Sequence, residues 1–231
     1  MKAQKANGII VEGLFKSFET KGSALTILKG INMRVELGEV VSILGRSGSG
    51  KTTFLSLLGA LDRPSKGTIN ILGTEISEAS NAGMEYLRRA DIGFVFQSFN
   101  LLPLLTVGEN VDLPLRMLGL SRQERWDRVQ ESLDQVGLGR YFYRLPEEIS
   151  GGEQQRVAIA RALAKKSRIV LADEPTGHLD SLTAESVFAV LQSAARDQGS
   201  LVIIATHDGS VAAKSDRVLK IQDGVLDTAT Q

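Results

Sequence analysis

The stretch GRSGSGKT, Gly45–Thr52, constrains the fold more than any other part of the sequence. It places two glycines, Gly45 and Gly50, with four residues between them and follows the second with Lys and Thr, a pattern typical of loops that bind phosphate groups. The apolar run at 39–44 before it indicates a buried strand, and the leucine spacing after it indicates a helix that ends before Pro64. In such a loop backbone N–H groups surround a polyphosphate, Lys51 adds a positive charge and Thr52 offers a hydroxyl to Mg²⁺. A chance match in a glycine- and serine-rich loop is the alternative, which the strand and helix on either side disfavour. The residues expected to bind the nucleotide here are Gly45, Arg46, Ser47, Gly48, Ser49, Gly50, Lys51, Thr52 and Thr53.

Composition excludes several classes of protein. The 231 residues include 27 Lys+Arg and 27 Asp+Glu, so the net charge is zero and a general nucleic-acid binder is not expected. The chain has no cysteine, which excludes disulfides, thiolate chemistry and cysteine metal sites. The first residues lack the apolar stretch of a secretion signal, and the longest charge-free run, 92–108, contains several polar residues. We interpret that run as a buried strand plus a loop, so any work at a membrane requires docking onto another protein.

The order of predicted elements indicates an α/β fold. Residues 31–37 alternate as a half-exposed strand does, and the runs RIVLADEP and LVIIATHD indicate buried strands on either side of a helix near 184–195. The final segment predicts a hairpin that turns at Asp223–Gly224. Strands that alternate with helices imply a mostly parallel sheet.

The middle of the chain changes character. We expect a single domain over 1–231, with a core formed by 1–97 and 146–231 and an inserted helical lobe at about 98–145. Within the lobe, Ser121 and Glu124 have the spacing of a capping box. The apolar stripe that follows is expected to form the core of the lobe; its members are Trp126, Val129, Leu133 and Val136.

Two acids end the strand at 168–172. A buried strand delivers side chains at its carboxyl end, where open α/β sheets bind ligands. Asp173 suits Mg²⁺, directly or through water, and Glu174 could polarise an attacking water. The alternative is the solvated start of a loop, which the phosphate loop disfavours.

The segment ISGGEQQR predicts a second anion site. Ser150 and Glu153 have capping-box spacing, and Gly151 and Gly152 leave the N–H groups of the helix start uncovered. Because the chain already has one phosphate loop, we infer that this helix faces the nucleotide of a second copy.

These motifs together resemble the ATPase subunits of ABC transporters, over almost the whole chain. The resemblance rests on the phosphate loop, Gln97 after an apolar strand, SGGEQ, LADEP, Leu179–Asp180 and ATHD, in that order. Three stretches, GFVFQSFNLLPLLTVGENVDLPL, ISGGEQQRVAIARAL and LADEPTGHLD, are similar to the lipoprotein-release and macrolide-exporter group (LolD, MacB and relatives). The resemblance implies a P-loop NTPase core with a mostly parallel sheet, an N-terminal antiparallel β subdomain and an inserted α-helical subdomain.

The resemblance also implies roles for individual residues. Gln97 would contact Mg²⁺ and the attacking water, and His207 would contact the γ-phosphate and hold Glu174 in place. Asp180 would cross the dimer interface, and Phe18 would stack on adenine. The residues that would close on the partner's γ-phosphate are Ser150, Gly151 and Gly152, with Glu153 beside them.

Each role has a plainer alternative. Gln97 could be a surface residue and His207 a structural histidine. Phe18 could be a core side chain, or Phe15 could be the residue that stacks on adenine. The pairs Arg88–Arg89 and Lys165–Lys166 are expected on solvated surfaces.

Two positions depart from the subgroup pattern. Residue 178 is His where Asn is usual, in a loop expected at the dimer interface, so the hydrolysis rate or communication between sites could differ. Residue 149 is Ile where Leu is typical, which is a conservative change.

The resemblance implies ATP and Mg²⁺ as cofactors, a second copy and an integral membrane permease subunit as partners, and no nucleic acid. The chain would work as a peripheral protein on the cytoplasmic face of the inner or plasma membrane, in export or lipoprotein extraction or in force transmission. A soluble ABC ATPase of repair or translation is the alternative, although such proteins usually carry coiled-coil insertions or two cassettes. A non-hydrolysing regulatory module is disfavoured by the intact acids. The substrate stays open.

Overall fold

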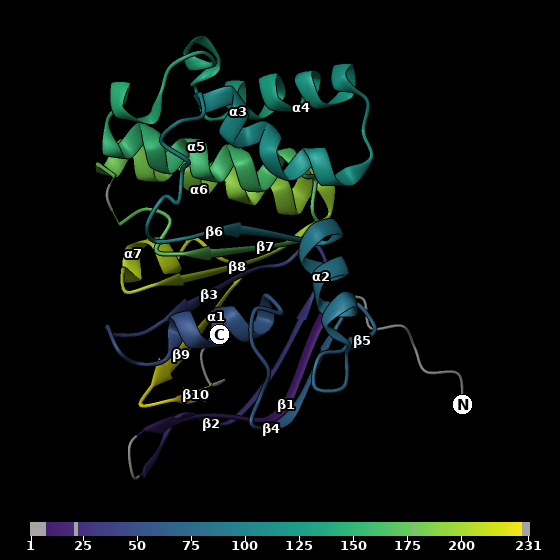
Figure 1. Cartoon of the computed structure of the whole chain (residues 1–231). Helices are drawn as coiled ribbons and strands as arrows, with labels where there is room; N and C mark the ends of the chain where they lie inside the picture. Colours follow the sequence, from purple (N-terminus) through teal and green to yellow (C-terminus); the bar gives the residue numbers. More distant parts are fainter. Residues whose placement is uncertain (1–7, 21–22, 178, 228–231) are drawn as a thin grey trace.

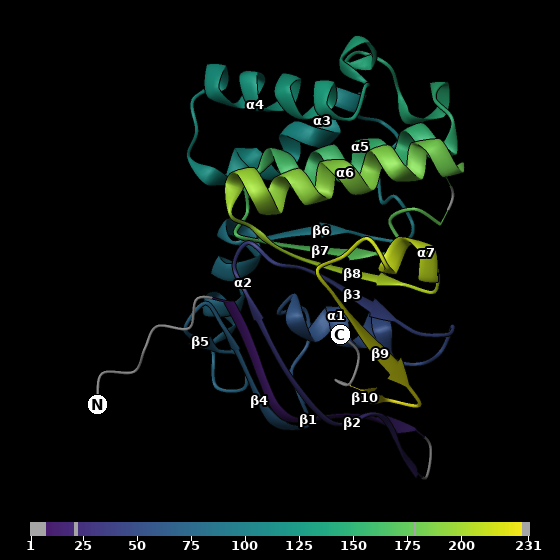
Figure 2. The same ribbon diagram turned by 180° about the vertical axis from the view of Figure 1, so that it is seen from behind.

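The computed structural model describes residues 8–20, 23–177 and 179–227. A six-stranded sheet lies between a layer of helices and a four-stranded sheet (Figures 1 and 2). The strands are β1 Gly8–Thr20, β2 Ser23–Glu36, β3 Val40–Leu44, β4 Lys66–Ile71, β5 Thr74–Glu75, β6 Ile92–Val95, β7 Ile169–Asp173, β8 Leu201–Thr206, β9 Arg217–Gln222 and β10 Val225–Asp227. The helices are α1 Lys51–Leu58, α2 Asn81–Ala90, α3 Val107–Asp112, α4 Arg122–Gln135, α5 Gly151–Ala164, α6 Ser181–Gln198 and α7 Gly209–Ala212, with short 3-10 helices η1 Leu113–Leu118, η2 Gly139–Tyr141 and η3 Pro146–Glu148.

The six-stranded sheet has the order β10-β9-β3-β8-β7-β6. Its central pairs are all parallel, and only the terminal hairpin β9–β10 is antiparallel. The hairpin turns at Asp223 and Gly224, both with positive φ, as the sequence predicts. The second sheet, β2-β1-β4-β5, is antiparallel throughout. The predicted mostly parallel core sheet and N-terminal antiparallel sheet are therefore confirmed.

Alternate residues of the buried strands face two apolar cores. In β7, Ile169 and Leu171 point to the core shared with α1 and the antiparallel sheet, whereas Val170 and Ala172 point to the core beneath the helical layer. This explains why the strand is a continuous apolar run, since both of its faces are covered. Helix α1 lies between the two sheets, and α5 and α6 cover the opposite face of the parallel sheet (Figure 1).

Helices α3 and α4 form the outermost part of the helical layer (Figures 1 and 2). Capping boxes begin α4 at Ser121–Glu124 and α5 at Ser150–Glu153, as predicted from their spacing. The division of the chain into core and inserted lobe stays a prediction, although α3, η1, α4 and η2 all fall within its limits of 98–145.

Two expectations about side chains were wrong. Trp126 does not belong to the apolar core of the helical layer: its side chain is 44% exposed and packs on Phe142, with ring centroids 4.5 Å apart. Lys165 is not on a solvated surface: it is 8% exposed, and its Nζ donates to the carbonyls of Arg88 and Ile92 at 2.7 and 2.6 Å. The sequence pattern predicts which face of a helix a residue lies on. It does not predict which backbone carbonyls of a neighbouring element will be available to accept from that residue.

Within the ranges that the structure describes, no helix has the length and apolar character needed to cross a membrane.

We predict that Lys165→Met destabilises the chain by about 1–3 kcal/mol, because two buried carbonyls lose their donor. Burial lowers the pKa of Lys165 from 10.5 to about 8, so the unfolded chain holds this proton more tightly. The contribution of Lys165 to stability therefore rises from about pH 8 to about pH 10, and the deficit of the variant should widen over that range. Urea unfolding at several pH values measures it.

Lys166→Met is the matched control, because Lys166 is exposed and its ammonium pairs with Glu131 on the surface. A deficit in Lys165→Met that stays constant with pH would contradict the assignment of the lowered pKa.

Candidate nucleotide-binding site

The loop between β3 and α1 forms a cradle of backbone groups. Gly48 and Gly50 have φ of 78° and 105°, a region that side chains rarely adopt. The Gly45 N–H donates to Thr206 O at 3.1 Å, which ties the start of the loop to the end of β8. The ammonium of Lys51 lies inside the loop and donates to the carbonyls of Gly45 and Arg46 at 2.8 and 3.2 Å. The loop thus wraps a buried positive charge at the N-terminus of α1, where an anion is also favoured.

Thr52 and Asp173 form the next contact in the site. The Thr52 hydroxyl donates to Asp173 Oδ2 at 2.7 Å, and Asp173 Oδ1 is buried with no hydrogen-bond partner among the described residues. Burial raises the pKa of the Asp173 carboxyl, and the hydrogen bond from Thr52 opposes that shift. A buried carboxylate oxygen without a donor beside a hydroxyl is a suitable place for a hard cation.

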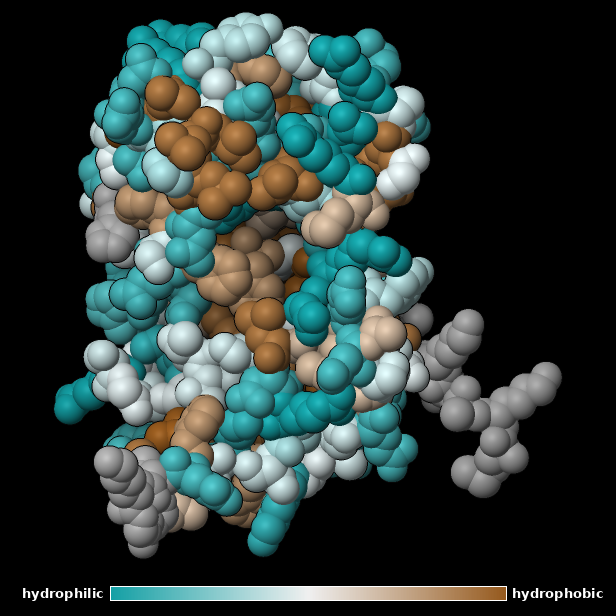
Figure 3. All heavy atoms as spheres, in the orientation of Figure 1, coloured by the Kyte–Doolittle hydropathy of each residue, from teal (hydrophilic) through white to brown (hydrophobic). Residues whose placement is uncertain are grey.

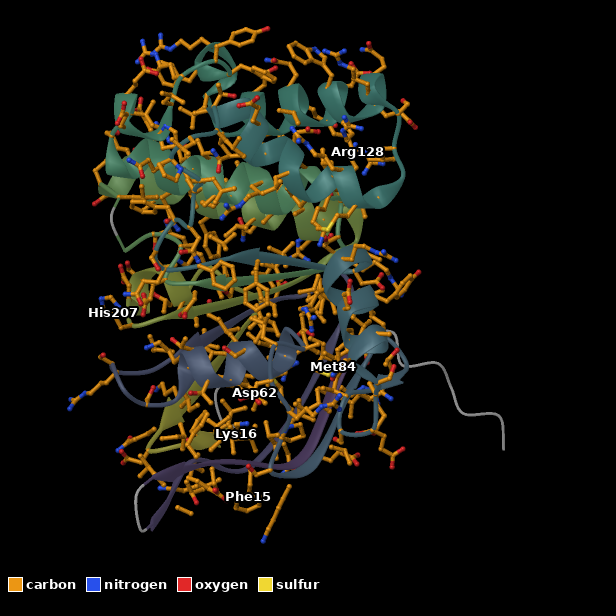
Figure 4. The ribbon with its side chains drawn as sticks, viewed as in Figure 1. Phe15, Lys16, Asp62, Met84, Arg128 and His207 are labelled. Carbon is orange, nitrogen blue, oxygen red and sulfur yellow. The ribbon has the colours of Figure 1, made fainter. Side chains whose placement is uncertain are left out.

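Glu174 is held from two sides. Its Oε1 lies 3.5 Å from Lys51 Nζ, and its Oε2 lies 3.0 Å from Nδ1 of His207 and accepts from the Thr206 hydroxyl at 3.3 Å. Its backbone has φ of 48°, an uncommon value for a residue with a side chain. Figure 4 shows His207 at the rim of the molecule, beside the edge where the parallel strands end. Glu174 is therefore positioned between a buried cation and an exposed imidazole.

These groups share one cavity of about 680 Å³. Most of the predicted site residues line it: Arg46, Ser47, Gly48, Gly50, Lys51, Thr52, Thr53, Gln97, Asp173, Glu174 and His207. Gly45 and Ser49 line an adjoining cavity of about 620 Å³ on the other side of the loop. The cavity combines a buried ammonium, loop N–H groups and acids, which suits a polyphosphate with a divalent cation.

Other predicted residues lie outside this cavity. Ser150 caps α5, and the N–H groups of Gly151 and Gly152 have no acceptor within the described part of the chain. Asp180 caps α6 by accepting from the N–H groups of Leu182 and Thr183. The structure therefore does not bring these groups to the nucleotide cradle of their own chain. Residue 178 lies outside the described residues.

Phe18 lies on β1, and its side chain is not among those lining the cavity. It is exposed, and the ammonium of Lys16 lies 5.0 Å from its ring centroid, while Asp62 binds that ammonium at 2.7 Å. Phe15 instead packs near Gly30, and Figure 4 shows it at the underside of the molecule, away from His207. The ring of Phe18 is exposed, and its role in stacking on adenine stays a prediction.

Two residues of the site were not singled out from the sequence. Ile27 of β2 lines the cavity, and Thr206 donates to Glu174. Thr206 was readable in principle, because it lies within the ATHD motif next to His207. No sequence pattern predicts that Ile27 lines the cavity, because its position there depends on how the antiparallel sheet packs against α1.

Comparison with known proteins identifies the family. The sequence profile described as ABC transporter matches residues 28–177. The chain belongs to the ABC transporter family. It is an ATP-binding and ATP-hydrolysing cassette of that family, as the family match and the similar solved cassette show. Over 211 residues the chain is 45% identical to the macrolide export ATP-binding/permease protein MacB of Shigella flexneri. The aligned region covers 91% of this chain and 32% of that protein.

A second relative and two solved structures agree with this. MacB of Bdellovibrio bacteriovorus is 41% identical over 220 residues, 94% of this chain and 33% of that protein. The chain thus spans about a third of the length of these curated relatives. The fold matches two dimeric structures of the ATP-binding cassette MJ0796, each with a TM-score of 0.90. One shares 40% sequence identity with this chain, and the other, a post-hydrolysis state bound to ADP and Pi, shares 39%. Each match covers 96% of this chain and 99% of that cassette.

We predict that Gly50→Ala destabilises the chain more than Gly48→Ala. Both residues have positive φ, so each substitution strains the backbone by about 1–2 kcal/mol. A Cβ at Gly50 would also lie 2.8 Å from Leu28 Cδ2, whereas a Cβ at Gly48 would meet nothing within 4 Å. Thermal unfolding without nucleotide measures the difference, and equal melting temperatures for the two variants would refute the close contact.

Proposed function

We propose that two copies of this chain enclose two ATP molecules, each between Gly45–Thr52 of one copy and Ser150–Gly152 of the other. The observation that carries this proposal is the start of α5, which is capped at Ser150 yet keeps the N–H groups of Gly151 and Gly152 without acceptors among the described residues. Those groups do not line the nucleotide cavity of their own chain. The similar cassette MJ0796 forms dimers, which supports the same assembly here.

Closure of such a dimer depends on the terminal phosphate. Hydrogen bonds to charged groups contribute roughly 1.5–3 kcal/mol each, so a few that form only with a γ-phosphate favour the closed state. Hydrolysis removes these contacts, and the dimer opens. In the closed state Asp180, at the start of α6, would contact the partner copy.

In the proposed hydrolysis, Glu174 polarises the attacking water and accepts its proton. His207 holds the Glu174 carboxylate through the 3.0 Å contact and contacts the γ-phosphate, while Gln97 orients the water. Lys51 lies within the loop and exchanges its carbonyl partners for phosphate oxygens. Positioning and neutralisation of charge account for most of the catalysis of such a reaction.

The site fits Mg²⁺ on the observation that Asp173 Oδ1 is buried without a donor beside the Thr52 hydroxyl. Thr52, Asp173 and Gln97 would hold the ion, which when bound neutralises charge on the β- and γ-phosphate oxygens. No group of three or more acidic, His or Cys side chains that could hold a metal occurs among the described residues. That agrees with Mg²⁺, which is usually held by one or two carboxylates together with the phosphates of the substrate.

We further propose that the cassette drives a membrane-embedded permease from the cytoplasmic face of the inner or plasma membrane. The relatives in Shigella flexneri and Bdellovibrio bacteriovorus are named as macrolide export ATP-binding/permease proteins, and two thirds of their length lies outside the match. Export or lipoprotein extraction is the kind of work that the subgroup suggests. A soluble role in repair or translation is not favoured, and recovery with ribosomes or nucleic acid instead of a membrane protein would support it.

The surface that would receive the permease lies beside α5 and η1. A groove of about 320 Å³ there is lined by apolar side chains, including Phe94, Phe96 and Met117, and by the cations Arg88, Arg161 and Lys165. None of the described residues that line it carries a carboxylate. Figure 3 shows apolar atoms gathered on the helical layer above a hollow whose floor is also apolar. This combination favours a cytoplasmic helix that carries apolar residues together with an acidic one.

We predict that Glu174→Gln lowers ATP turnover by about 10²–10⁴-fold, because the general base is lost while the shape of the site is kept. ATP-dependent dimerisation should persist or strengthen, as measured by size-exclusion chromatography with and without ATP–Mg²⁺. Glu185→Gln is the control, since Glu185 is exposed and pairs with Lys214 outside the cavity. Turnover that survives in Glu174→Gln would refute the role of Glu174.

We predict crosslinks from residues 99–105 to a co-expressed permease. Leu104 is 91% exposed in the segment between Asn100, which lines the groove, and α3, and the chain has no cysteine, so Leu104→Cys provides one defined attachment point. Val225→Cys, on β10 at the opposite end of the molecule from the helical layer, is the control (Figure 1). Crosslinks from both positions alike, or from neither, would argue against docking at the groove.

A further inference from the structure

Lys16 is a buried cation on β1 that has no part in the hydrolysis described above. A lysine is seldom buried without a partner. Its Nζ pairs with Asp62 Oδ2 at 2.7 Å and donates to the carbonyl of Arg63 at 2.9 Å. Both partners follow α1, the helix that begins in the phosphate loop, and Figure 4 shows Lys16 and Asp62 beside each other below that helix. Lys16 therefore ties β1 to the far end of the helix that starts at the nucleotide cradle.

The segment that binds Lys16 is itself fixed in place. The guanidinium of Arg63 donates to the carbonyls of Ile76 and Ala79 at 3.1 and 2.6 Å. The backbone N–H of Arg63 donates to Asp62 Oδ1 at 2.7 Å, which leaves Oδ2 for the ammonium. The carboxylate and the carbonyl that hold Lys16 are thus anchored to the segment between β5 and α2, and they give the ammonium a defined position.

The same ammonium lies over the ring of Phe18. It is 5.0 Å from the ring centroid, a distance at which a cation is attracted to the face of an aromatic ring. The ring is nevertheless 43% exposed. One face of Phe18 is therefore occupied by a buried, paired cation, and the exposed part of the ring is open to a stacking partner.

The pairing of β1 with β2 is irregular at Lys16. Lys16 pairs with Leu28 and the next residue, Ser17, pairs with Thr26, so Ile27 is an extra residue of β2. Extra residues of this kind redirect side chains beside functional sites. Ile27 lines the nucleotide cavity, so the irregularity that directs Ile27 to the cavity lies opposite Lys16.

The ring of Phe18 lies a short distance from that cavity. Phe18 is opposite Leu25 in the pairing of β1 with β2, and both side chains are exposed. Leu25 precedes Ile27 by two residues, which places this apolar pair about 7 Å along β2 from the cavity wall. The base of a nucleotide whose phosphates occupy the loop can reach a platform at this distance.

We propose that Lys16 is a positioning residue for recognition of the nucleotide base. The proposal rests on the proposed binding of ATP at Gly45–Thr52 with its base on Phe18. One ammonium faces the ring of Phe18 and also pairs with Asp62 beyond α1, so it fixes how far the base platform lies from the phosphate loop. A platform held in advance lowers the cost of ordering on binding, and the base and phosphates of one nucleoside di- or triphosphate are bound together.

Calorimetric titration of the full chain with Mg²⁺–ADP and with Mg²⁺–pyrophosphate separates the base from the phosphates. ADP has no γ-phosphate, so the proposed dimer does not enter the measurement. Lys16→Met should weaken ADP affinity by about three- to tenfold, because the ring loses its cation, and should leave pyrophosphate affinity within about twofold. In ATP hydrolysis KM should rise by the same factor, whereas kcat should stay within about twofold.

Further variants separate positioning from damage to the fold. Lys16→Arg should restore most of the ADP affinity, because a guanidinium also pairs with a carboxylate and lies over an aromatic ring. Phe18→Leu should weaken ADP affinity by about tenfold, and Lys16→Met added to it should cause no further loss. Lys66→Met is the matched control, since Lys66 is an exposed lysine at the start of β4, and it should bind ADP as wild type does.

Asp62→Asn decides the question if Lys16→Met does not fold. It removes the ion pair and keeps the lysine, and it should weaken ADP affinity by about two- to threefold without a change for pyrophosphate.

The outcomes distinguish this inference from the proposed function. An equal loss of ADP and pyrophosphate affinity in Lys16→Met, or no loss of either, overturns the positioning role, and the same holds for Asp62→Asn where only that variant folds. A double variant weaker than Phe18→Leu alone overturns it too, because Lys16 would then act other than through the ring. Wild-type ADP affinity in Phe18→Leu overturns the platform itself. A chain that gives the expected ADP results yet stays monomeric with ATP overturns the proposed dimer and supports the role of Lys16.

Discussion

The parallel pairing of β3, β8, β7 and β6 is the constraint on which the rest of the structure depends. The ladder sets Leu44 opposite Thr206, Asp173 opposite Ala205, and Val95 opposite Ala172. All four strands therefore end at the same edge, where open α/β sheets bind their ligands. The loop after each strand delivers one part of the site, although these parts lie far apart in the sequence. A slip of one residue in β7 would turn Asp173 to the opposite face of the sheet and disrupt the site.

The edge of the sheet concentrates charge that the fold has to balance. Lys51 is buried beside Glu174, and Asp173 is buried with one carboxylate oxygen that has no partner in the described part of the chain. Burial of unpaired charge is costly, so sites of this kind are found where function requires them. Glu174 also has an uncommon backbone conformation, which costs about 1–3 kcal/mol at such positions. Buried charge and local strain at one residue agree with its proposed role in polarising water.

The elements predicted correctly from the sequence are those whose signals are local. The loop at Gly45–Thr52, the capping box at Ser150–Glu153 and the turn at Asp223–Gly224 each depend on residues within eight positions of one another. Their geometry follows from conformational freedom of glycine and from short-range hydrogen bonds. Lys165 and Trp126 were misjudged because their surroundings come from α2 and from the turn at Phe142, far from them in the chain.

The sequence by itself determined the family, the phosphate loop, the acids at 173 and 174 and the helix start at Ser150, because each is a short pattern with its own local physics. Only the tertiary structure showed that Glu174 is held between Lys51 and His207, and that Arg161 binds the carbonyls after Gln97. Backbone carbonyls carry no sequence signal, since every residue has one. Which of them meets a distant guanidinium or ammonium is decided by packing of helices against strands, and that packing is a property of the whole chain.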